Sequence, residues 1–328
     1  MRTGIVVTAR PGVEDVARRA EELGFSSFWV YDTPMVNGDP FVPLALCAKA
    51  ARRIKLGIGV TSPALRSAPA AAAAVSSLNA IAPGRVICGV GTGNTARRTL
   101  GMAPTKMVEL DAFTEALQNL TAGRETQYTE GNRTRTIKFL HVGRYVNIED
   151  PVEFVVAAFG LNAAAIAGRR GAGVISFGLL APDAWTSFEQ ARRAAACDAG
   201  QPEAAECYVM TSLHVLADGE DRYGALARDS MGHVALALLT FAADNRAFGD
   251  SLGLVITSSN CFKAGIDAVK AGQLYGTATE DPVTIAKQTA TYVVKYLSGL
   301  NPPRTETVQE NRITATDVGK FAAQCSHA

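Results

Sequence analysis

The sequence predicts an α/β protein built on an eight-stranded (β/α) barrel of the TIM type. The chain has 328 residues, short apolar runs alternate with longer helical patterns, and seven βα units follow one another in order. Repetition of this kind at this length is typical of a barrel of parallel strands. An open doubly wound sheet is the alternative that the pattern leaves.

The first four strands can be assigned in order. Runs of apolar and β-branched residues predict strands, and apolar residues three and four positions apart predict helices. The expected strands are 4–8, 27–31, 54–61 and 85–90, and the expected helices between them are 13–23, 43–51 and 69–81. Gly24 ends the first helix, while Pro83 and Gly84 end the third.

The later units are less regular. A helix over 106–120 precedes a polar stretch, 122–135, which we expect to be a surface loop or a hairpin. The expected strands that follow are 154–158, 173–177 and 206–216, with helices over 161–169 and 182–199.

After residue 218 the repeating pattern fades. An apolar helix is expected over 231–243 and a short strand over 253–257, but the residues beyond do not repeat the earlier unit. We therefore divide the chain into a barrel over 1–255 and an atypical C-terminal βα segment over 256–328.

Composition excludes several classes of protein. Hydrophobic residues make up 48% and charged residues 19%, as in compact soluble proteins. With 32 basic and 31 acidic residues, the net charge is +1, so we expect no nucleic-acid or anionic membrane partner. The first residues lack the apolar centre of a signal peptide, and no apolar run reaches the length of a membrane span.

The six cysteines and four histidines are scattered, without the spacing of a metal site. Cys88 lies within an expected strand, and His214 within another; we expect a buried core thiol and a core histidine. A GxSxG motif is absent, so nucleophilic hydrolysis has no support. These features predict a cytoplasmic protein with reduced thiols and no metal.

A glycine-rich turn follows the fourth strand, at the end of a barrel where ligands bind. Its residues are Gly91, Thr92, Gly93, Asn94 and Thr95. Glycines leave backbone N–H groups open to a phosphate, Thr and Asn add hydrogen bonds, and Arg97 and Arg98 supply positive charge. The turn matches neither the dinucleotide fingerprint nor a P-loop, so a purely structural turn stays equally open.

Two further candidates follow other strands. One is a turn at the start of the helix after the fifth strand, which could bind phosphate through backbone N–H groups or serve as a helix cap. Its residues are Gly160, Leu161, Asn162 and Ala163. The other is Asp32, which either orients a cofactor, acts as an acid or base, or forms a turn before Pro34.

These residues together resemble the bacterial luciferase-like family of flavin- and deazaflavin-dependent oxidoreductases. The resemblance is carried by VYDTP at 30–34, RIKLGIGVTSP at 53–63, GRVICGVGTGNTARRTLGM at 84–102 and VVAAFGLNAAAIAGRRGAGVI at 155–175. It implies a barrel that binds FMN or the deazaflavin coenzyme F420 in its mouth. It also implies oxygenation of, or hydride transfer with, a small organic substrate, and a homodimer.

The resemblance assigns roles to individual residues. Val60 and Thr61 stand where the family often has a cis peptide behind the ring, residues 91–95 where it binds the cofactor phosphate, and residues 160–163 at a second phosphate-side turn. Many members have Asp-His where this chain has Asp32 and Thr33, so the usual catalytic histidine is missing. Asp32 is then the best candidate for a catalytic polar group.

Residues 258–321 resemble the last segment of periplasmic sugar-binding proteins of the ribose-binding type. This implies a fusion or chimera in which residues 272–297 replace barrel elements. Two other functions follow as alternatives: a sugar-binding module with Asn260, Phe262 and Asp281 in its site, or a chimeric barrel without catalytic activity. An exported parent would also make Cys261 and Cys325 a disulfide pair.

Overall fold

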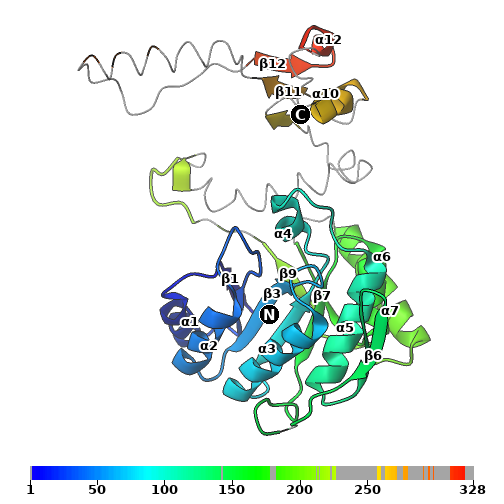
Figure 1. The fold of residues 1–328 in the computed structure, drawn as a ribbon. Helices are drawn as coiled ribbons and strands as arrows, with labels where there is room; N and C mark the ends of the chain where they lie inside the picture. Colours follow the sequence, from blue (N-terminus) through cyan, green and yellow to red (C-terminus); the bar gives the residue numbers. More distant parts are fainter. Residues whose placement is uncertain are drawn as a thin grey trace. The chain divides into compact units, whose positions relative to one another are not determined.

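Two compact units make up the chain, Met1–Thr211 and Ser212–Ala328, and each is described by itself (Figure 1). The computed structural model describes residues 2–141, 143–177, 182–211, 213, 215–221, 224–226, 257–259, 263–271, 276–279, 291, 295, 298 and 311–321. The helix expected over 231–243 lies outside the described residues, as does the strand over 253–257 apart from residue 257.

The first unit is a parallel sheet in which the strands follow one another in chain order. Its strands are β1 (Gly4–Val7), β2 (Ser27–Val30), β3 (Lys55–Thr61), β4 (Val86–Val90), β7 (Glu153–Ala157), β8 (Gly173–Phe177) and β9 (Tyr208–Met210). A doubly wound sheet reverses its strand order at a switch point. This sheet has no reversal among its seven described strands, so the doubly wound alternative is wrong and the barrel-type winding is confirmed.

Helices cover the outside of this sheet (Figure 1). They are α1 (Val13–Glu22), α2 (Phe41–Ala50), α3 (Ala68–Ile81), α5 (Met107–Thr121), α6 (Leu161–Arg169) and α7 (Pro182–Asp198). A further short helix, α4 (Asn94–Thr99), lies at the end of the strands and is not expected from the sequence (Figure 1). Helix α2 begins two residues before the expected start at Pro43, because proline is tolerated in the first helical turn.

One apolar cluster shows that the sheet is curled. Trp29 of β2, Ile87 of β4 and Val155 of β7 are buried together. The partly buried side chains packed against them come from β1, β8 and β9, namely Val6, Ile175 and Tyr208. A flat sheet would keep the side chains of its two edge strands, β1 and β9, far apart. Because side chains from both edge strands pack in one cluster, the sheet is curved and this cluster lies on its inner face, as in a barrel.

Two stretches correct or refine the expected elements. The polar stretch over 122–135 is a hairpin, β5 (Thr126–Glu130) and β6 (Arg133–Ile137). Strand β9 has three residues instead of the eleven expected over 206–216. Its pairing with β8 ends where Met210 meets Phe177. The apolar alternation over 206–216 therefore overestimates the length of this strand.

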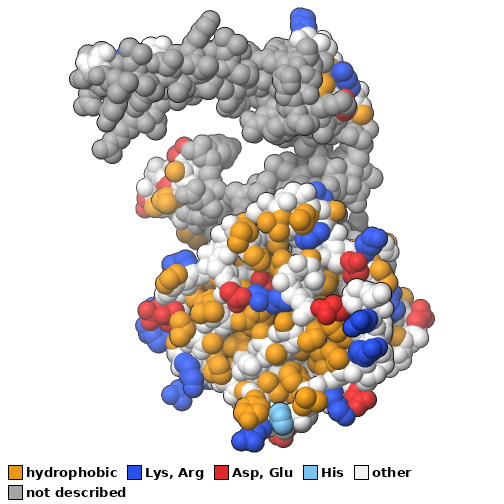
Figure 2. Space-filling model, viewed as in Figure 1, with side chains coloured by type: hydrophobic (Ala, Val, Ile, Leu, Met, Phe, Trp, Pro, Cys, Tyr) orange, Lys and Arg blue, Asp and Glu red, His pale blue; other side chains and the backbone are white. Residues whose placement is uncertain are grey.

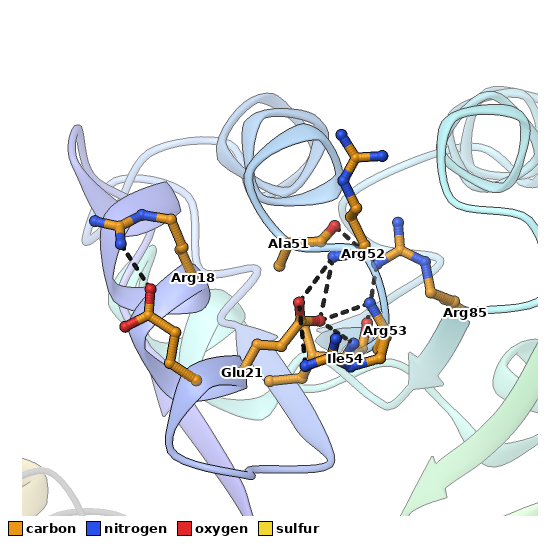
Figure 3. A network of polar contacts seen from close by, with 8 residues as sticks. Arg18, Glu21, Ala51, Arg52, Arg53, Ile54 and Arg85 are labelled. Carbon is orange, nitrogen blue, oxygen red and sulfur yellow. Dashed lines mark hydrogen bonds and ion pairs between the residues drawn. The ribbon is translucent and has the colours of Figure 1, made fainter.

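Glu21 ties α1 to the connection between α2 and β3 (Figure 3). Its carboxylate accepts backbone N–H groups from Arg52 at 3.1 Å, from Arg53 at 2.5 Å and from Ile54 at 2.7 Å. Burial alone would raise the pKa of Glu21, but the three backbone hydrogen bonds outweigh it, so this pKa lies below its ordinary value. Arg85 donates to the carbonyls of Ala51 and Ile54 in the same connection.

The second unit contains a three-stranded sheet of β10 (Thr257–Ser259), β11 (Gly276–Thr279) and β12 (Asn311–Thr314). Strands β10 and β11 are parallel and are separated in sequence by α10 (Lys263–Lys270), while β12 is antiparallel to β11. Ile266, Val269 and Ile313 are buried in this unit. The βα pattern expected near the C-terminus is therefore present.

Charges of both signs are interspersed on the visible face of the first unit (Figure 2). This view agrees with the balance of basic and acidic residues in the sequence. Within the part of the chain that the structure describes, no helix is both long and apolar enough to cross a membrane.

Candidate functional site

The carboxyl ends of the parallel strands bring the expected site residues to one edge of the sheet. Asp32 follows β2, Thr61 ends β3, residues 91–95 follow β4 and Gly160 precedes α6 after β7. One hydrogen bond joins the ends of β3 and β4 directly, because the Gly91 N–H donates to the carbonyl of Thr61 at 2.9 Å. Gly91 also lies close to Ala157 at the end of β7, since a Cβ added at Gly91 would be 3.2 Å from Cβ of Ala157.

The end of β3 has an irregular backbone. The peptide bond between Gly59 and Val60 is cis, as the family resemblance implies, and the register with β4 shifts between Ile58 and Thr61. The Val60 side chain lies against two glycines of β4 and its following turn. A Cβ at Gly89 or at Gly91 would lie 2.7 Å from a methyl group of Val60. These two glycines therefore leave space for protein packing.

The outer part of the turn is open to solvent. We call residues 91–95 the glycine corner. Gly91 is buried, but Thr92, Gly93 and Asn94 are half-buried and Thr95 is exposed. Gly93 has a φ of 71°, in the left-handed region that favours glycine, and is the residue before α4. The first N–H groups of a helix have no acceptor within the helix.

Thr61, the last residue of β3, has a polar side chain in the protein interior. The residue is fully buried, and its Oγ1 atom has no hydrogen-bond partner among the described residues. A buried polar group without a partner costs about 1–3 kcal/mol. Thr61 also accepts the Gly91 N–H through its carbonyl, so its backbone is bonded to the first residue of the glycine corner.

Arg97 and Arg98, expected as charge partners for a phosphate, both bind protein groups. The Nε of Arg97 donates to the carbonyl of Ala103 at 2.9 Å, and the Nε of Arg98 donates to Oδ1 of Asn94 at 2.7 Å. Arg98 thereby orients the Asn94 side chain within the glycine corner.

Asp32 is the expected catalytic residue, and its side chain is fully buried. Arg66 donates to both of its carboxylate oxygens at 3.3 Å, from Nε to Oδ2 and from Nη2 to Oδ1. Burial alone would lower the pKa of Arg66, but hydrogen bonds to Asp32 and Asp39 outweigh it and raise this pKa. The sequence does not predict that Arg66 and Asp39 belong to this site. The one signal available is that Arg66 is an arginine shortly before the start of a helix.

The structure also shows where the remaining expected residues lie. Gly160 has an extended backbone and precedes α6, where Leu161 and Asn162 are exposed and Ala163 is buried. Cys88 is buried in β4, and burial raises the pKa of its thiol to about 12, which confirms a core thiol. His214 lies outside the described residues.

The parallel sheet is singly wound and curls around an apolar interior, and its polar residues lie at the carboxyl ends of the strands. These features define a (β/α) barrel protein. Residues 7–265, more than half of the chain, match the family model described as luciferase-like monooxygenase. The chain belongs to this family.

Individual relatives agree with the family. Over 184 residues the chain is 33% identical to an F420-dependent glucose-6-phosphate dehydrogenase from Kineococcus radiotolerans, which covers 50% of this chain and 52% of the relative. The chain spans about half the length of the curated relatives it matches.

Two solved structures share the fold. The coenzyme F420-dependent tetrahydromethanopterin reductase from Methanopyrus kandleri has a TM-score of 0.55 at 22% identity, over 64% of this chain and 65% of that one. The monooxygenase RslO1 from Streptomyces bottropensis has a TM-score of 0.56 at 18% identity, over 99% and 96%. At these identities the likeness concerns the fold alone.

Proposed function

We propose that the chain is an oxidoreductase that binds the deazaflavin F420, or alternatively FMN, at the strand carboxyl ends and acts on a small organic substrate. The observation that carries the proposal is Thr61, whose buried hydroxyl has no hydrogen-bond partner in the described part of the chain and whose carbonyl is bonded to Gly91 of the glycine corner. Family membership and the F420-dependent relative support the choice of coenzyme. Bound there, such a coenzyme supplies hydride transfer or, as reduced flavin, oxygen activation.

The residues present fit such a group. The Thr61 hydroxyl would hydrogen-bond it, Val60 would support the ring, and the outer part of the glycine corner, Thr92 to Thr95, would hold the phosphate. Residues 160–163 would bind the phosphate side from the neighbouring strand end. Asp32 would act as an orienting group, because its carboxylate is buried and paired with Arg66 and therefore presents no open oxygen to a substrate proton.

Titration of the purified chain with F420 and with FMN tests this function. We expect saturable quenching of the fluorescence of one coenzyme, with a stoichiometry of one per chain. Absence of binding by both would contradict the proposal. Titration with ribose tests the sugar-binding alternative, whose candidate residues Asn260, Phe262 and Asp281 lie outside the described residues.

We also propose a cytoplasmic homodimer. Helix α2 is apolar nearly throughout, and Val42 and Leu46 are 68% and 49% exposed. A helix that is apolar on all sides is usually covered. Sedimentation should therefore give a dimer that dissociates when Val42 and Leu46 are both replaced by Asp, and a monomeric wild type would contradict this.

We infer that residues 256–328 come from a sugar-binding protein of the ribose-binding type, which would make the chain a chimera. The parallel β10–α10–β11 unit with antiparallel β12 supports this origin. Cys261 and Cys325 lie outside the described residues, so their pairing remains a proposal for thiol titration.

A further inference from the structure

Arg66 connects three segments at the carboxyl edge of the sheet. Besides its paired hydrogen bonds to Asp32, its Nη2 donates to Oδ2 of Asp39 at 2.7 Å. Its guanidinium carbon also lies 4.9 Å from the centre of the Phe41 ring, at the start of α2. Asp32 and Asp39 are the two ends of the connection between β2 and α2, so one guanidinium holds both ends of this loop.

The backbone of Arg66 is itself fixed. The N–H groups of Leu65 and Arg66 donate to the carbonyl of Ser62, which forms a turn directly after β3. The next residue, Ser67, caps α3 by accepting the Ala70 N–H at 3.4 Å. Arg66 is therefore a rigid support, and the loop from 33 to 38 is the part that it holds in place.

This loop presents apolar side chains in a constrained turn. The N–H groups of Val36 and Asn37 both donate to the carbonyl of Thr33, and Gly38 donates to the carbonyl of Ala9. Met35 lies at the tip with a φ of 70°, a conformation that costs energy for a residue other than glycine. Met35 is 79% exposed and Val36 58% exposed. The constrained turn begins directly after Asp32 and thus holds two large apolar side chains in solvent at the end of β2.

The charge of this region also restricts the ligand. The positive charge of Arg66 is matched by two carboxylates, one fully buried and one partly exposed. This arginine therefore has no uncompensated charge to offer a phosphorylated substrate, whereas a neutral aliphatic group would cover the exposed apolar side chains.

We propose that Arg66 is a positioning residue that presents the loop tip, Met35 and Val36, as the specificity-determining surface for a neutral substrate with an aliphatic part. This inference rests on the proposed function, because it concerns the substrate side of the same coenzyme site. The substrate proposed here differs from that of the glucose-6-phosphate dehydrogenase relative, whose named substrate carries a phosphate.

The test uses the full chain saturated with whichever coenzyme it binds. Dissociation constants for 2-butanol, 2-octanol and glucose 6-phosphate are measured from the fluorescence of the bound coenzyme. We expect 2-octanol to bind at least about tenfold more tightly than 2-butanol, because each added methylene contributes to burial, and glucose 6-phosphate to give no response.

Met35→Gly is the informative variant, since glycine favours a φ of 70° and keeps the turn while removing the apolar side chain. We expect unchanged coenzyme affinity and melting temperature but a preference for 2-octanol reduced about threefold or more. Leu140→Ser, at another exposed apolar residue, is the matched control and should change nothing. Arg66→Met should weaken 2-octanol binding, and Arg66→Lys should restore it only in part because lysine lacks the planar fork.

The outcomes separate the two proposals. If neither coenzyme binds the wild type, the proposed function fails. If a coenzyme binds but chain length has no effect, no alcohol responds, glucose 6-phosphate binds, or Met35→Gly behaves like the wild type, the positioning of an apolar loop tip by Arg66 is overturned.

Discussion

Glu21→Ala is expected to lower the free energy of unfolding by about 3 kcal/mol. The substitution removes a carboxylate that accepts the backbone N–H groups of Arg52, Arg53 and Ile54. Without it, three N–H donors at the entry to β3 lose a charged acceptor. Because Ile54 is buried, water cannot readily replace the carboxylate as the acceptor of its N–H. Urea denaturation of the variant and the wild type measures the difference.

Glu22→Ala is the matched control for this prediction. Glu22 stands next to Glu21 on α1 but forms exposed ion pairs with Arg18 and Arg19. Surface pairs of this kind contribute little to stability, so we expect almost no change. Equal effects of the two substitutions would show that the backbone contacts of Glu21 are unimportant.

The Glu21 effect should also depend on pH. A carboxylate with a pKa lowered by folding stabilises the native state fully above its unfolded-state pKa, about 4.3. This stabilisation is lost as the pH falls through the lower folded-state pKa. The difference between wild type and Glu21→Ala should therefore be constant near neutral pH and shrink on acidification below about 4.3; a difference that grows in acid would have the wrong sign.

Gly57→Ala is expected to destabilise the barrel by about 3 kcal/mol. A Cβ at Gly57 would lie 2.2 Å from Cδ2 and Cε3 of Trp29. The ring cannot move freely, since its Nε1 donates to Oγ of Ser27 at 3.0 Å and it packs edge-on against Tyr208 with centroids 4.9 Å apart. Thermal and urea unfolding measure the loss.

A double-mutant cycle identifies the cause. Trp29→Leu alone should cost about 3 kcal/mol through the cavity that it leaves. Combined with Gly57→Ala, the cost should be well below the sum, because the added methyl group fills part of that space. Additive losses of stability would show that Gly57→Ala acts through the backbone conformation and not through a clash with the Trp29 ring.

Much of the fold could be predicted because local pattern and global winding agree. Buried strands such as β2 and β4 are continuous apolar runs, and α3 is delimited by Ser67 and Pro83. The cis peptide at Val60 followed from the family resemblance and not from the residues, since nothing in a Gly-Val pair marks it.

Contacts between distant residues could not be predicted in the same way. Gly91 is required by the Val60 side chain, a neighbour about thirty residues earlier that only the strand register brings near. Arg66 looks like a surface residue in the sequence, yet it pairs with Asp32 across two strand ends. The apolar alternation after Met210 likewise carries no information about where the neighbouring strand stops.

Coenzyme affinity of the Thr61→Val variant tests the central claim most directly. Valine removes a buried hydroxyl that has no partner among the described residues, so the unliganded variant should be as stable as the wild type or more so. Its affinity for the coenzyme should nevertheless fall about tenfold, the equivalent of one lost hydrogen bond. Thr114→Val is the control, because the Thr114 hydroxyl already donates to the carbonyl of Leu110 at 2.7 Å and lies on α5. The account predicts weaker coenzyme binding without loss of stability for Thr61→Val alone; unchanged binding in that variant would contradict it.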